Sequence, residues 1–268
     1  MLYVILPIYK RPKITYNFLM QLKNQDYCDE FSLVIVDASG DSLIDSIVVG
    51  SKEFDFPITL VKGTPQWYWG KSIVKGINSI LEKLERDDSV LLINDDIIIK
   101  SNYLSTASKL LNNSDRNTIF GSAIKRPNNP NILSDISILI RPLKFKIFSE
   151  NVHVSELKPE YSTDLVSGRG MLIPAGIILS NLTINFRIFP HHLADMSFSL
   201  KAKARGAKLK ISSLMVVELL PEPLENIKKA NVLNKYFDIK SNTRLISLAS
   251  FWFLVLWLKF KRLISNVI

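Results

Sequence analysis

Residues 91–99 read Leu91-Leu92-Ile93-Asn94-Asp95-Asp96-Ile97-Ile98-Ile99, an apolar run interrupted by two adjacent carboxylates. The Leu and Ile residues before the interruption predict a strand that is buried on both faces. Two ionised carboxylates at the end of such a strand repel each other and lose hydration unless a cation or hydrogen-bond donors compensate. A divalent metal ion is the simplest compensation. The alternative is that Asp95 and Asp96 form a solvated turn or a helix cap.

The chain around this stretch alternates between short apolar segments and segments with helical spacing. Strands are expected at Leu2–Leu6, Ser32–Asp37, Ile58–Lys62 and Val90–Ile93, and helices at Ile14–Lys23 and Lys71–Glu85. This alternation predicts an α/β fold with a mostly parallel, Rossmann-like sheet and helices on both faces. Ligands of such sheets bind at the carboxyl ends of the strands.

Composition limits the classes of protein to consider. The 268 residues suffice for one large domain with an appendage, and the single cysteine, Cys28, excludes an internal disulfide and a cysteine-based zinc site. We expect Cys28 to be a small buried residue. The apolar N-terminus is followed at once by Lys10, Arg11 and Lys13, so we interpret it as the first core strand and not as a signal sequence.

Polar residues follow the first two strands as well as the fourth. The first strand continues as Pro7-Ile8-Tyr9-Lys10-Arg11-Pro12, and the second continues as Asp37-Ala38-Ser39-Gly40-Asp41. These strand ends are expected to lie along one edge. A carboxylate there can accept from a base N–H or a ribose hydroxyl, and a Tyr or Arg can stack on a base or meet phosphate. Alternatively, Pro12 and Gly40 are ordinary loop residues and Asp37 caps the next helix.

Further motifs follow in a fixed order. They are Trp67-Tyr68-Trp69-Gly70 opening a helix, Ser167-Gly168-Arg169-Gly170-Met171-Leu172-Ile173-Pro174, and Phe189-Pro190-His191-His192-Leu193-Ala194-Asp195. Together with the strand ends they resemble the family 2 glycosyltransferases of the GT-A fold, such as bacterial polysaccharide, O-antigen and rhamnosyltransferase-like enzymes. The resemblance covers roughly residues 2–217. It implies a catalytic domain at 1–220, with a nucleotide-sugar half at 1–100 and an acceptor half at 101–220.

The resemblance implies a nucleotide-diphosphate sugar donor, a Mg²⁺ or Mn²⁺ ion, a glycan or lipid-linked glycan acceptor, and inversion at the anomeric carbon. Such a cation would lower the barrier by bridging the oxygens of the leaving diphosphate. The implied metal ligands are Asp96, Asp95 and His192, with His191 as an alternative to His192. Asn94 stands where the family often has an acid. The implied donor-binding residues are Pro7, Tyr9, Arg11, Asp37, Ser39, Gly70, Asn94, Asp95 and Arg169.

Catalysis also requires a base that takes the proton of the acceptor hydroxyl. The family commonly uses the Asp of a Glu-Asp pair, and here Ala194 replaces the Glu while Asp195 remains. The resemblance therefore assigns the base role to Asp195. The alternative role for Asp195 is the N-cap of the helix that follows. Trp67, Tyr68 and Trp69 could stack on a sugar, but each is expected to be a core residue.

The C-terminal extension, residues 221–268, carries an apolar segment from Leu245 to Leu258 that is followed by Lys259, Lys261 and Arg262. Its length falls short of the roughly 20 residues that cross a bilayer. Two Trp residues and flanking cations instead favour a helix in the membrane interface. That implies a peripheral protein on the cytoplasmic face of the plasma membrane, where a lipid-linked acceptor is presented. The alternative is a helix docked on the domain or in a homo-oligomer seam.

Three other functions compete with that of a glycosyltransferase. Nucleic-acid binding is disfavoured because the basic residues are scattered or lie beside the apolar tail, with no recognisable module. A sugar-nucleotide pyrophosphorylase would need a Gly-rich phosphate loop after the first strand, and residues 7–12 are not Gly-rich. A degenerate glycosyltransferase that binds sugar nucleotides or assists assembly remains open, because Asn94 and Ala194 depart from the family pattern.

Overall fold

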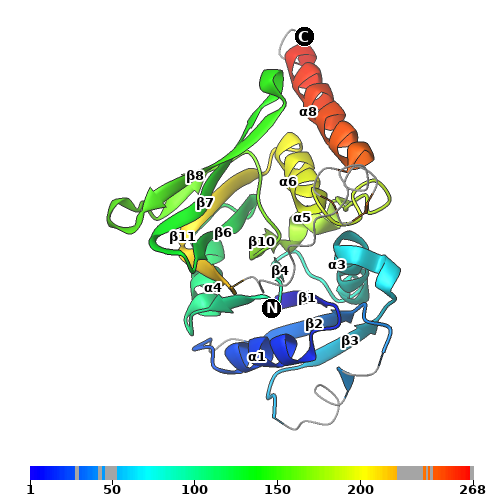
Figure 1. Ribbon diagram of the computed structural model, residues 1–268, viewed down its shortest axis with the longest axis vertical. Coiled ribbons are helices and arrows are strands. Elements are labelled where there is room, and N and C mark those ends of the chain that lie inside the picture. Colours follow the sequence, from blue (N-terminus) through cyan, green and yellow to red (C-terminus); the bar gives the residue numbers. More distant parts are fainter. Residues whose placement is uncertain are drawn as a thin grey trace.

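The computed structural model describes residues 1–27, 30–41, 44–45, 53–221, 238–239, 241 and 244–265, with side chains as far as Lys261. The expectation of a buried Cys28, and the basic side chains of Lys240 and Arg262, lie outside the described residues. One mixed sheet forms the centre of the molecule, and helices cover it (Figure 1). Its strand order is β3-β2-β1-β4-β10-β6-β11-β5.

The N-terminal strands are β1 (Leu2–Ile8), β2 (Phe31–Asp37), β3 (Ile58–Lys62) and β4 (Ser89–Leu92). They pair in parallel, which confirms the parallel arrangement expected for the first four strands. The helices α1 (Pro12–Lys23) and α3 (Tyr68–Ile80) lie where helical spacing predicted them. α3 begins three residues earlier and ends five residues earlier than expected, because residues 81–83 form a turn.

The order of these four strands creates a topological switch point. The chain passes from β1 to β2 and β3 on one side, and then returns to place β4 on the other side of β1. Register pairs Ile5 with Leu92 and Ile8 with Asp37, so the three strands end at the same edge. Parallel sheets bind ligands in the crevice at such a point, which here lies between the ends of β1 and β4.

The second half of the sheet is mixed, unlike the first. Its strands are β5 (Ile97–Ile99), β6 (Thr118–Arg126), β7 (Asn129–Arg141), β8 (Lys146–His153), β9 (Glu160–Ser162), β10 (Met171–Pro174) and β11 (Lys208–Leu219). β10 is antiparallel to both β4 and β6, and β11 is parallel to β6. β5 follows β4 after four residues, yet it pairs with β11 at the other end of the sheet. The aspartates therefore lie where the chain leaves one part of the sheet for another.

Helices cover both faces of the sheet. In the described part of the chain the other helices are α4 (Tyr103–Asn112), α5 (Ala175–Leu179), α6 (Ala194–Ala204) and α8 (Leu245–Ser265). One apolar core lies between the sheet and α1 and α4, and a second lies between the opposite face and α3, α5, α6 and α8. Short 3₁₀ turns occur at Pro65–Trp67, Pro142–Lys144 and Val154–Glu156.

Two long elements extend to the end of the molecule opposite β1–β3. The β7–β8 hairpin runs to the top of Figure 1 beside α8. The ring of Phe145 at the hairpin turn lies 5.4 Å from that of Trp252 on α8, in an edge-to-face arrangement. Within the described part of the chain, no helix combines the length and hydropathy that a membrane crossing requires.

Candidate active site

The crevice between β1 and β4 holds a cluster of three charged side chains. Arg11, which directly precedes α1, donates from Nη1 to Asp96 Oδ2 at 3.0 Å and from Nη2 to Asp95 Oδ1. Thr15, one turn into α1, donates from Oγ1 to Asp95 Oδ2 at 2.7 Å. Asp95 and Asp96 are therefore bridged by the guanidinium of Arg11, which follows the end of the neighbouring strand β1.

Asp95 and Asp96 differ in their surroundings. The residue Asp95 is 1% exposed, and this burial raises the pKa of its carboxyl to about 6, although Arg11 and Thr15 act in the opposite direction. Asp96 has a half-open side chain, but its Oδ1 is buried and has no hydrogen-bond partner among the described residues. Asp95 is the buried anchor of the cluster, and Asp96 retains an oxygen that can accept a further partner.

The ends of β1 and β2 are linked by a second set of polar contacts. Asp37 is 2% exposed, and its Oδ1 accepts from the backbone N–H of Ser39 at 2.9 Å. Ser39 Oγ in turn accepts from the backbone N–H of Lys10 at 2.8 Å. Pro7 is buried within β1, whereas Tyr9 is exposed just beyond it. The predicted donor-binding residues of the first two strands thus lie at one edge, but Asp37 faces inward.

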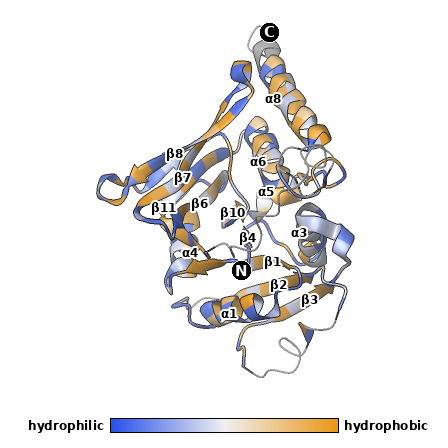
Figure 2. Ribbon diagram, in the orientation of Figure 1, coloured by the Kyte–Doolittle hydropathy of each residue, from blue (hydrophilic) through white to orange (hydrophobic). Residues whose placement is uncertain are grey.

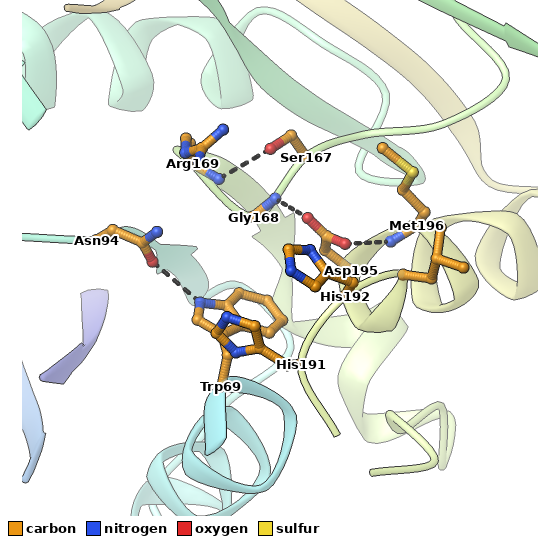
Figure 3. Close-up of a pocket in the computed structure, with 10 residues that line it drawn as sticks. Trp69, Asn94, Ser167, Gly168, Arg169, His191, His192, Asp195 and Met196 are labelled. Carbon is orange, nitrogen blue, oxygen red and sulfur yellow. Dashed lines mark hydrogen bonds between the residues drawn. The ribbon is translucent and has the colours of Figure 1, made fainter. Parts of the chain in front are cut away.

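A pocket of about 280 Å³ lies beside this edge (Figure 3). Its lining comes from four separate segments and consists of Trp69, Asn94, Ser167, Gly168, Arg169, His191, His192, Leu193, Asp195 and Met196. Four of the predicted site residues meet here: Asn94, Arg169, His192 and Asp195. Gly70 is not among the residues that line the pocket. Its N–H donates to the Pro190 carbonyl at 2.8 Å and connects α3 to the loop that carries His191 and His192.

The indole of Trp69 forms the floor between the segments. Its Nε1 donates to Asn94 Oδ1 at 3.0 Å, so Asn94 is held by an aromatic side chain that we expected in the core. Gly168 lies directly over the ring, and a Cβ at that position would come within 2.3 Å of Trp69 Cζ2. The close approach of this loop to the indole therefore requires glycine.

Asp195 is fixed by backbone donors. The residue stands in the first turn of α6, whose N-cap is Leu193, so the helix-cap alternative is wrong. Its Oδ2 accepts from the Gly168 N–H at 2.7 Å and its Oδ1 from the Met196 N–H at 2.8 Å (Figure 3). Burial raises the pKa of Asp195, while the two amides and the nearby Arg169 partly offset that increase. A carboxylate of raised pKa at a pocket wall is suited to accept a proton.

The loop before α6 is strained. Leu193 adopts φ 64°, a left-handed conformation that is uncommon for a residue other than glycine. The rings of His191 and His192 stack edge to face with centroids 4.8 Å apart, and both line the pocket. Such strain is maintained only where the surrounding structure enforces it, as in binding sites.

The predicted metal ligands are not assembled into one cluster. Across the described residues, no three His, Cys, Asp or Glu side chains converge in a way that would hold an ion. His192 lines the pocket, whereas Asp95 is enclosed by Arg11 and Thr15. The unpartnered Oδ1 of Asp96 nevertheless fits a cation that takes its other ligands from the phosphates of a bound donor.

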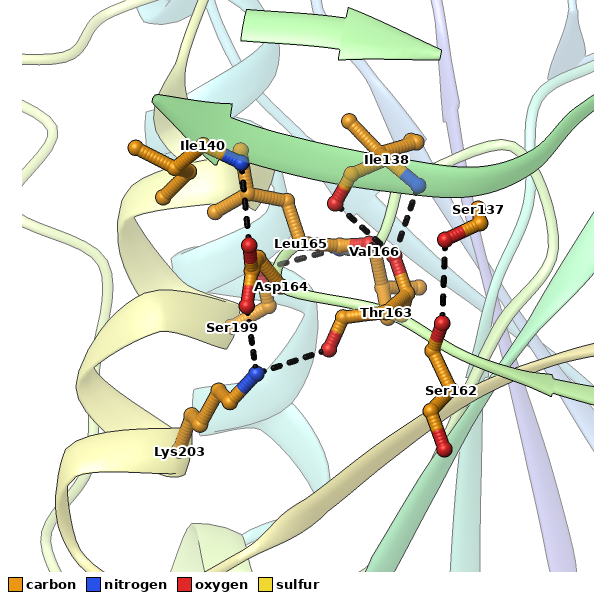
Figure 4. A network of polar contacts seen from close by, with 10 residues as sticks. All are labelled: Ser137, Ile138, Ile140, Ser162, Thr163, Asp164, Leu165, Val166, Ser199 and Lys203. Carbon is orange, nitrogen blue, oxygen red and sulfur yellow. Dashed lines mark hydrogen bonds and ion pairs between the residues drawn. The ribbon is translucent and has the colours of Figure 1, made fainter. Parts of the chain in front are cut away.

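One face of α6 holds the loop that carries Gly168. Side chains at helical spacing meet the chain between β9 and β10 in turn. Asp195 accepts from the Gly168 N–H (Figure 3). Ser199 Oγ accepts from the Val166 N–H at 3.1 Å, and Lys203 Nζ donates to Asp164 Oδ1 at 2.7 Å (Figure 4). Asp164 Oδ2 also accepts from the Ile140 N–H of β7 at 2.9 Å. This polar ladder fixes the loop between the hairpin and the pocket.

Known structures were compared with this fold. A mannosyltransferase, PcManGT from Pyrobaculum calidifontis, in complex with GDP-Man and Mn²⁺ matches with TM-score 0.59 at 17% identity, over 83% of this chain and 58% of that one. S. aureus TarS 1–349 in complex with UDP-GlcNAc matches with TM-score 0.56 at 18% identity, over 86% and 61%. GalNAc-T7 with UDP, GalNAc and Mn²⁺ matches with TM-score 0.63 at 10% identity, over 84% and 44%. The chain has a GT-A-type glycosyltransferase fold.

This likeness is one of fold. The chain spans between 44% and 61% of the length of these three structures. No protein-family model and no curated protein matches the sequence. The expected GT-A architecture is confirmed, while the assignment of individual site residues rests on the geometry described above.

Sequence reasoning missed one residue of the site and gave only part of the role of another. Trp69 packs against the core as expected, and it also lines the pocket and binds Asn94. Thr15 was not considered, although it stands four residues after Arg11, the spacing at which helical side chains share a face. That spacing was a usable signal for Thr15, whereas only the fold reveals which side of the aromatic segment faces the pocket.

Proposed function

We propose that this protein is a metal-dependent, inverting glycosyltransferase that moves a sugar from a nucleotide-diphosphate donor to a glycan or lipid-linked glycan. The single observation that supports it most strongly is the pocket beside the β1–β4 switch point, where Asp195 and Arg169 meet Asn94 from the end of β4. The setting we propose is surface polysaccharide synthesis on the cytoplasmic face of the plasma membrane.

The residues take the following roles in this proposal. Asp195 accepts the proton of the acceptor hydroxyl as that oxygen attacks the anomeric carbon. Arg169 and Arg11 pair with the donor diphosphate, because a guanidinium matches phosphate oxygens with two parallel N–H bonds. Tyr9 and Ser39 lie at the nucleotide side of the edge. Asp96, through Oδ1, and His192 would hold a Mg²⁺ or Mn²⁺ ion, which would supply positive charge for the leaving diphosphate.

In this proposal Arg11 exchanges Asp96 Oδ2 for the donor diphosphate, while the ion would take Oδ1 of the same carboxylate. The Arg11 guanidinium bridges both aspartates and provides the positive charge that they need. A metal-bound diphosphate brings both a cation for Asp96 and an anion for Arg11, so the partners can exchange without leaving either charge unpaired.

A second candidate is a catalytically inactive subunit that binds sugar nucleotides. Two observations favour it. Arg11 already pairs with Asp95 and Asp96, and the described residues contain no cluster of three possible metal ligands. Both candidates predict nucleotide binding, and only the first predicts turnover.

Release of sugar from GDP-, UDP- and dTDP-linked donors separates the two candidates. The wild type is assayed with and without Mn²⁺, beside Asp96→Ala and the control Asp87→Asn, an exposed carboxylate at the opposite end of the sheet. We expect Mn²⁺-dependent release that Asp96→Ala loses and Asp87→Asn keeps. Donor binding without turnover, with any acceptor supplied, would instead support the inactive subunit. The anomeric configuration of a transfer product tests inversion.

A further inference from the structure

The C-terminal helix is apolar on two sides, and only one of them is used by the fold. On the inner side Phe251, Trp252 and Val255 are buried in the core shared with α6. Ser247 Oγ also donates to the Ile188 carbonyl at 2.8 Å. The sequence alternatives of a docked helix and an interfacial helix therefore do not exclude each other, because docking uses less than half of the helix circumference.

The outer side of α8 carries a continuous apolar ridge. It consists of Ile246, Phe253, Leu256, Trp257 and Phe260, which recur at helical spacing, and Phe253 and Phe260 are 72% and 63% exposed. Isolated apolar side chains are normal on a protein surface, but a ridge of this length marks an interaction site.

The turn of the β7–β8 hairpin adds a second apolar element at the same end of the molecule. Leu143 at its tip is 89% exposed and Phe145 is 59% exposed, and Phe145 contacts α8 through Trp252. Figure 2 shows apolar residues along α8, and Figure 1 shows the hairpin turn and the C-terminal half of α8 at the end remote from β1–β3.

The described charged side chains that flank these two elements in sequence have one sign. Lys144 and Lys146 flank the hairpin tip, and Lys259 and Lys261 flank the end of the ridge; all four are exposed. Residues 239–268 contain no acidic residue. A second copy of the chain packed on the ridge would bring lysine against lysine with no acid to pair, whereas an anionic bilayer offers both negative headgroups and an apolar layer.

We propose that the α8 ridge and the β7–β8 hairpin tip together form one surface that inserts into the headgroup region of an anionic lipid bilayer. It contacts the bilayer without crossing it, because α8 lies against the protein along its inner side. This proposal rests on the proposed function in one respect: a lipid-linked acceptor would reach the pocket from the membrane surface. The polar ladder on α6 connects the hairpin strand β7 to the loop of Gly168.

Vesicle flotation tests the surface. The full chain is mixed with vesicles of phosphatidylcholine alone or of phosphatidylcholine with phosphatidylglycerol. We expect binding to the anionic vesicles that weakens with salt. Replacing Phe253, Trp257 and Phe260 together by Gln should abolish it, and Leu143→Gln should reduce it. Lys144→Glu and Lys146→Glu should each lower the affinity by roughly fivefold or more. Leu214→Gln and Lys83→Glu, exposed residues elsewhere, should bind as the wild type does.

Three results would overturn the proposal. They are equal binding to neutral vesicles, unchanged binding by the ridge variant, and a dimer in light scattering that the ridge variant dissociates without any effect on vesicles. The last would assign the ridge to a second copy of the chain. Donor hydrolysis by the same variants is measured in parallel. Vesicle binding without any donor hydrolysis would contradict the proposed function but support the proposed membrane surface. Donor hydrolysis without vesicle binding would support the proposed function but contradict the membrane surface.

Discussion

The two acidic centres of this protein are stabilised in different ways. Asp95 and Asp96, after β4, are neutralised by the side chain of Arg11. Asp195, at the start of α6, receives its hydrogen bonds from the backbone amides of Gly168 and Met196. A guanidinium on a flexible stem can move to another anion, whereas a backbone amide in a packed loop cannot.

The difference matches two chemical tasks. A site that binds and releases a charged donor needs ion pairs that can exchange partners, and the pairs of Arg11 with Asp95 and Asp96 are of this kind. A proton acceptor needs a constant position and a constant pKa, and the amides around Asp195 supply both. The predictions below test whether one centre is exchangeable and the other fixed.

The largest expected effect is that of Asp195→Asn. The amide oxygen of Asn can still accept from the Gly168 N–H, so the fold and the donor site should persist. Loss of the proton acceptor should lower transfer by about 10²–10⁴-fold, with donor affinity within a few fold of the wild type. Single-turnover rates and donor titration measure the two quantities. A large loss of donor affinity would refute the base assignment and place Asp195 in donor binding.

The next effect is that of Arg11→Met on stability. It leaves the buried Asp95 without its cation, which should lower the free energy of unfolding by about 1–3 kcal/mol, less than for a fully buried pair because Arg11 is partly exposed. Asp95→Asn added to Arg11→Met should recover part of this loss. The exposed pair of Lys62 and Asp45 is the control, and Lys62→Met should cost only about 0–1 kcal/mol. If urea denaturation shows that Arg11→Met and Lys62→Met lower the free energy of unfolding equally, Arg11, Asp95 and Asp96 do not act as an electrostatic unit.

Gly168→Ala should disturb the fixed centre. The added Cβ would lie 2.3 Å from the Trp69 ring. Either the indole or the loop must move, at about 1–3 kcal/mol. We expect lower stability, altered tryptophan fluorescence and slower transfer. Gly206→Ala is a control for a glycine with open space around it, although its φ of 97° adds strain of its own. Unchanged fluorescence and rate would mean that the loop does not need this close contact.

The smallest expected effect is the shift in pH dependence that Arg169→Gln should cause, in addition to the weaker donor binding expected when the diphosphate loses this guanidinium. The Arg169 cation lowers the pKa of Asp195 against the increase caused by burial. Removing it should raise that pKa, and because the base must be ionised, the acid limb of kcat/KM should move to higher pH. The exposed Arg187→Gln is the control. A limb that stays in place would mean that another group titrates in the assay.

Local pattern sufficed for the parallel half of the sheet. Alternating apolar strands and helices placed β1 to β4, and the resemblance in motif order predicted the GT-A fold. The bridge from Arg11 to Asp95 was beyond reach, because it joins residues 84 positions apart and depends on which strands become neighbours. The same holds for β5, which leaves β4 to pair with β11.

The candidate site was predictable in parts. Asn94, Arg169, His192 and Asp195 were selected from motifs and meet in one pocket. Asp95 and Asp96 do not line this pocket and Asp37 is buried, and both facts follow from side-chain packing, which a single sequence does not encode locally. For α8 the apolar composition was evident, but its division into a docked side and an exposed ridge required the fold.

The central claim is that the exchangeable centre binds the donor and the fixed centre performs the proton transfer. A crystal structure with a nucleotide sugar and Mn²⁺ tests it most directly. We predict the diphosphate between the ends of β1 and β4, the ion on Asp96, Arg11 turned from Asp96 to phosphate, and Asp195 still bound to the Gly168 amide beside the anomeric carbon. A donor bound elsewhere, or a bound donor with Arg11 still bridging both aspartates, would contradict the account.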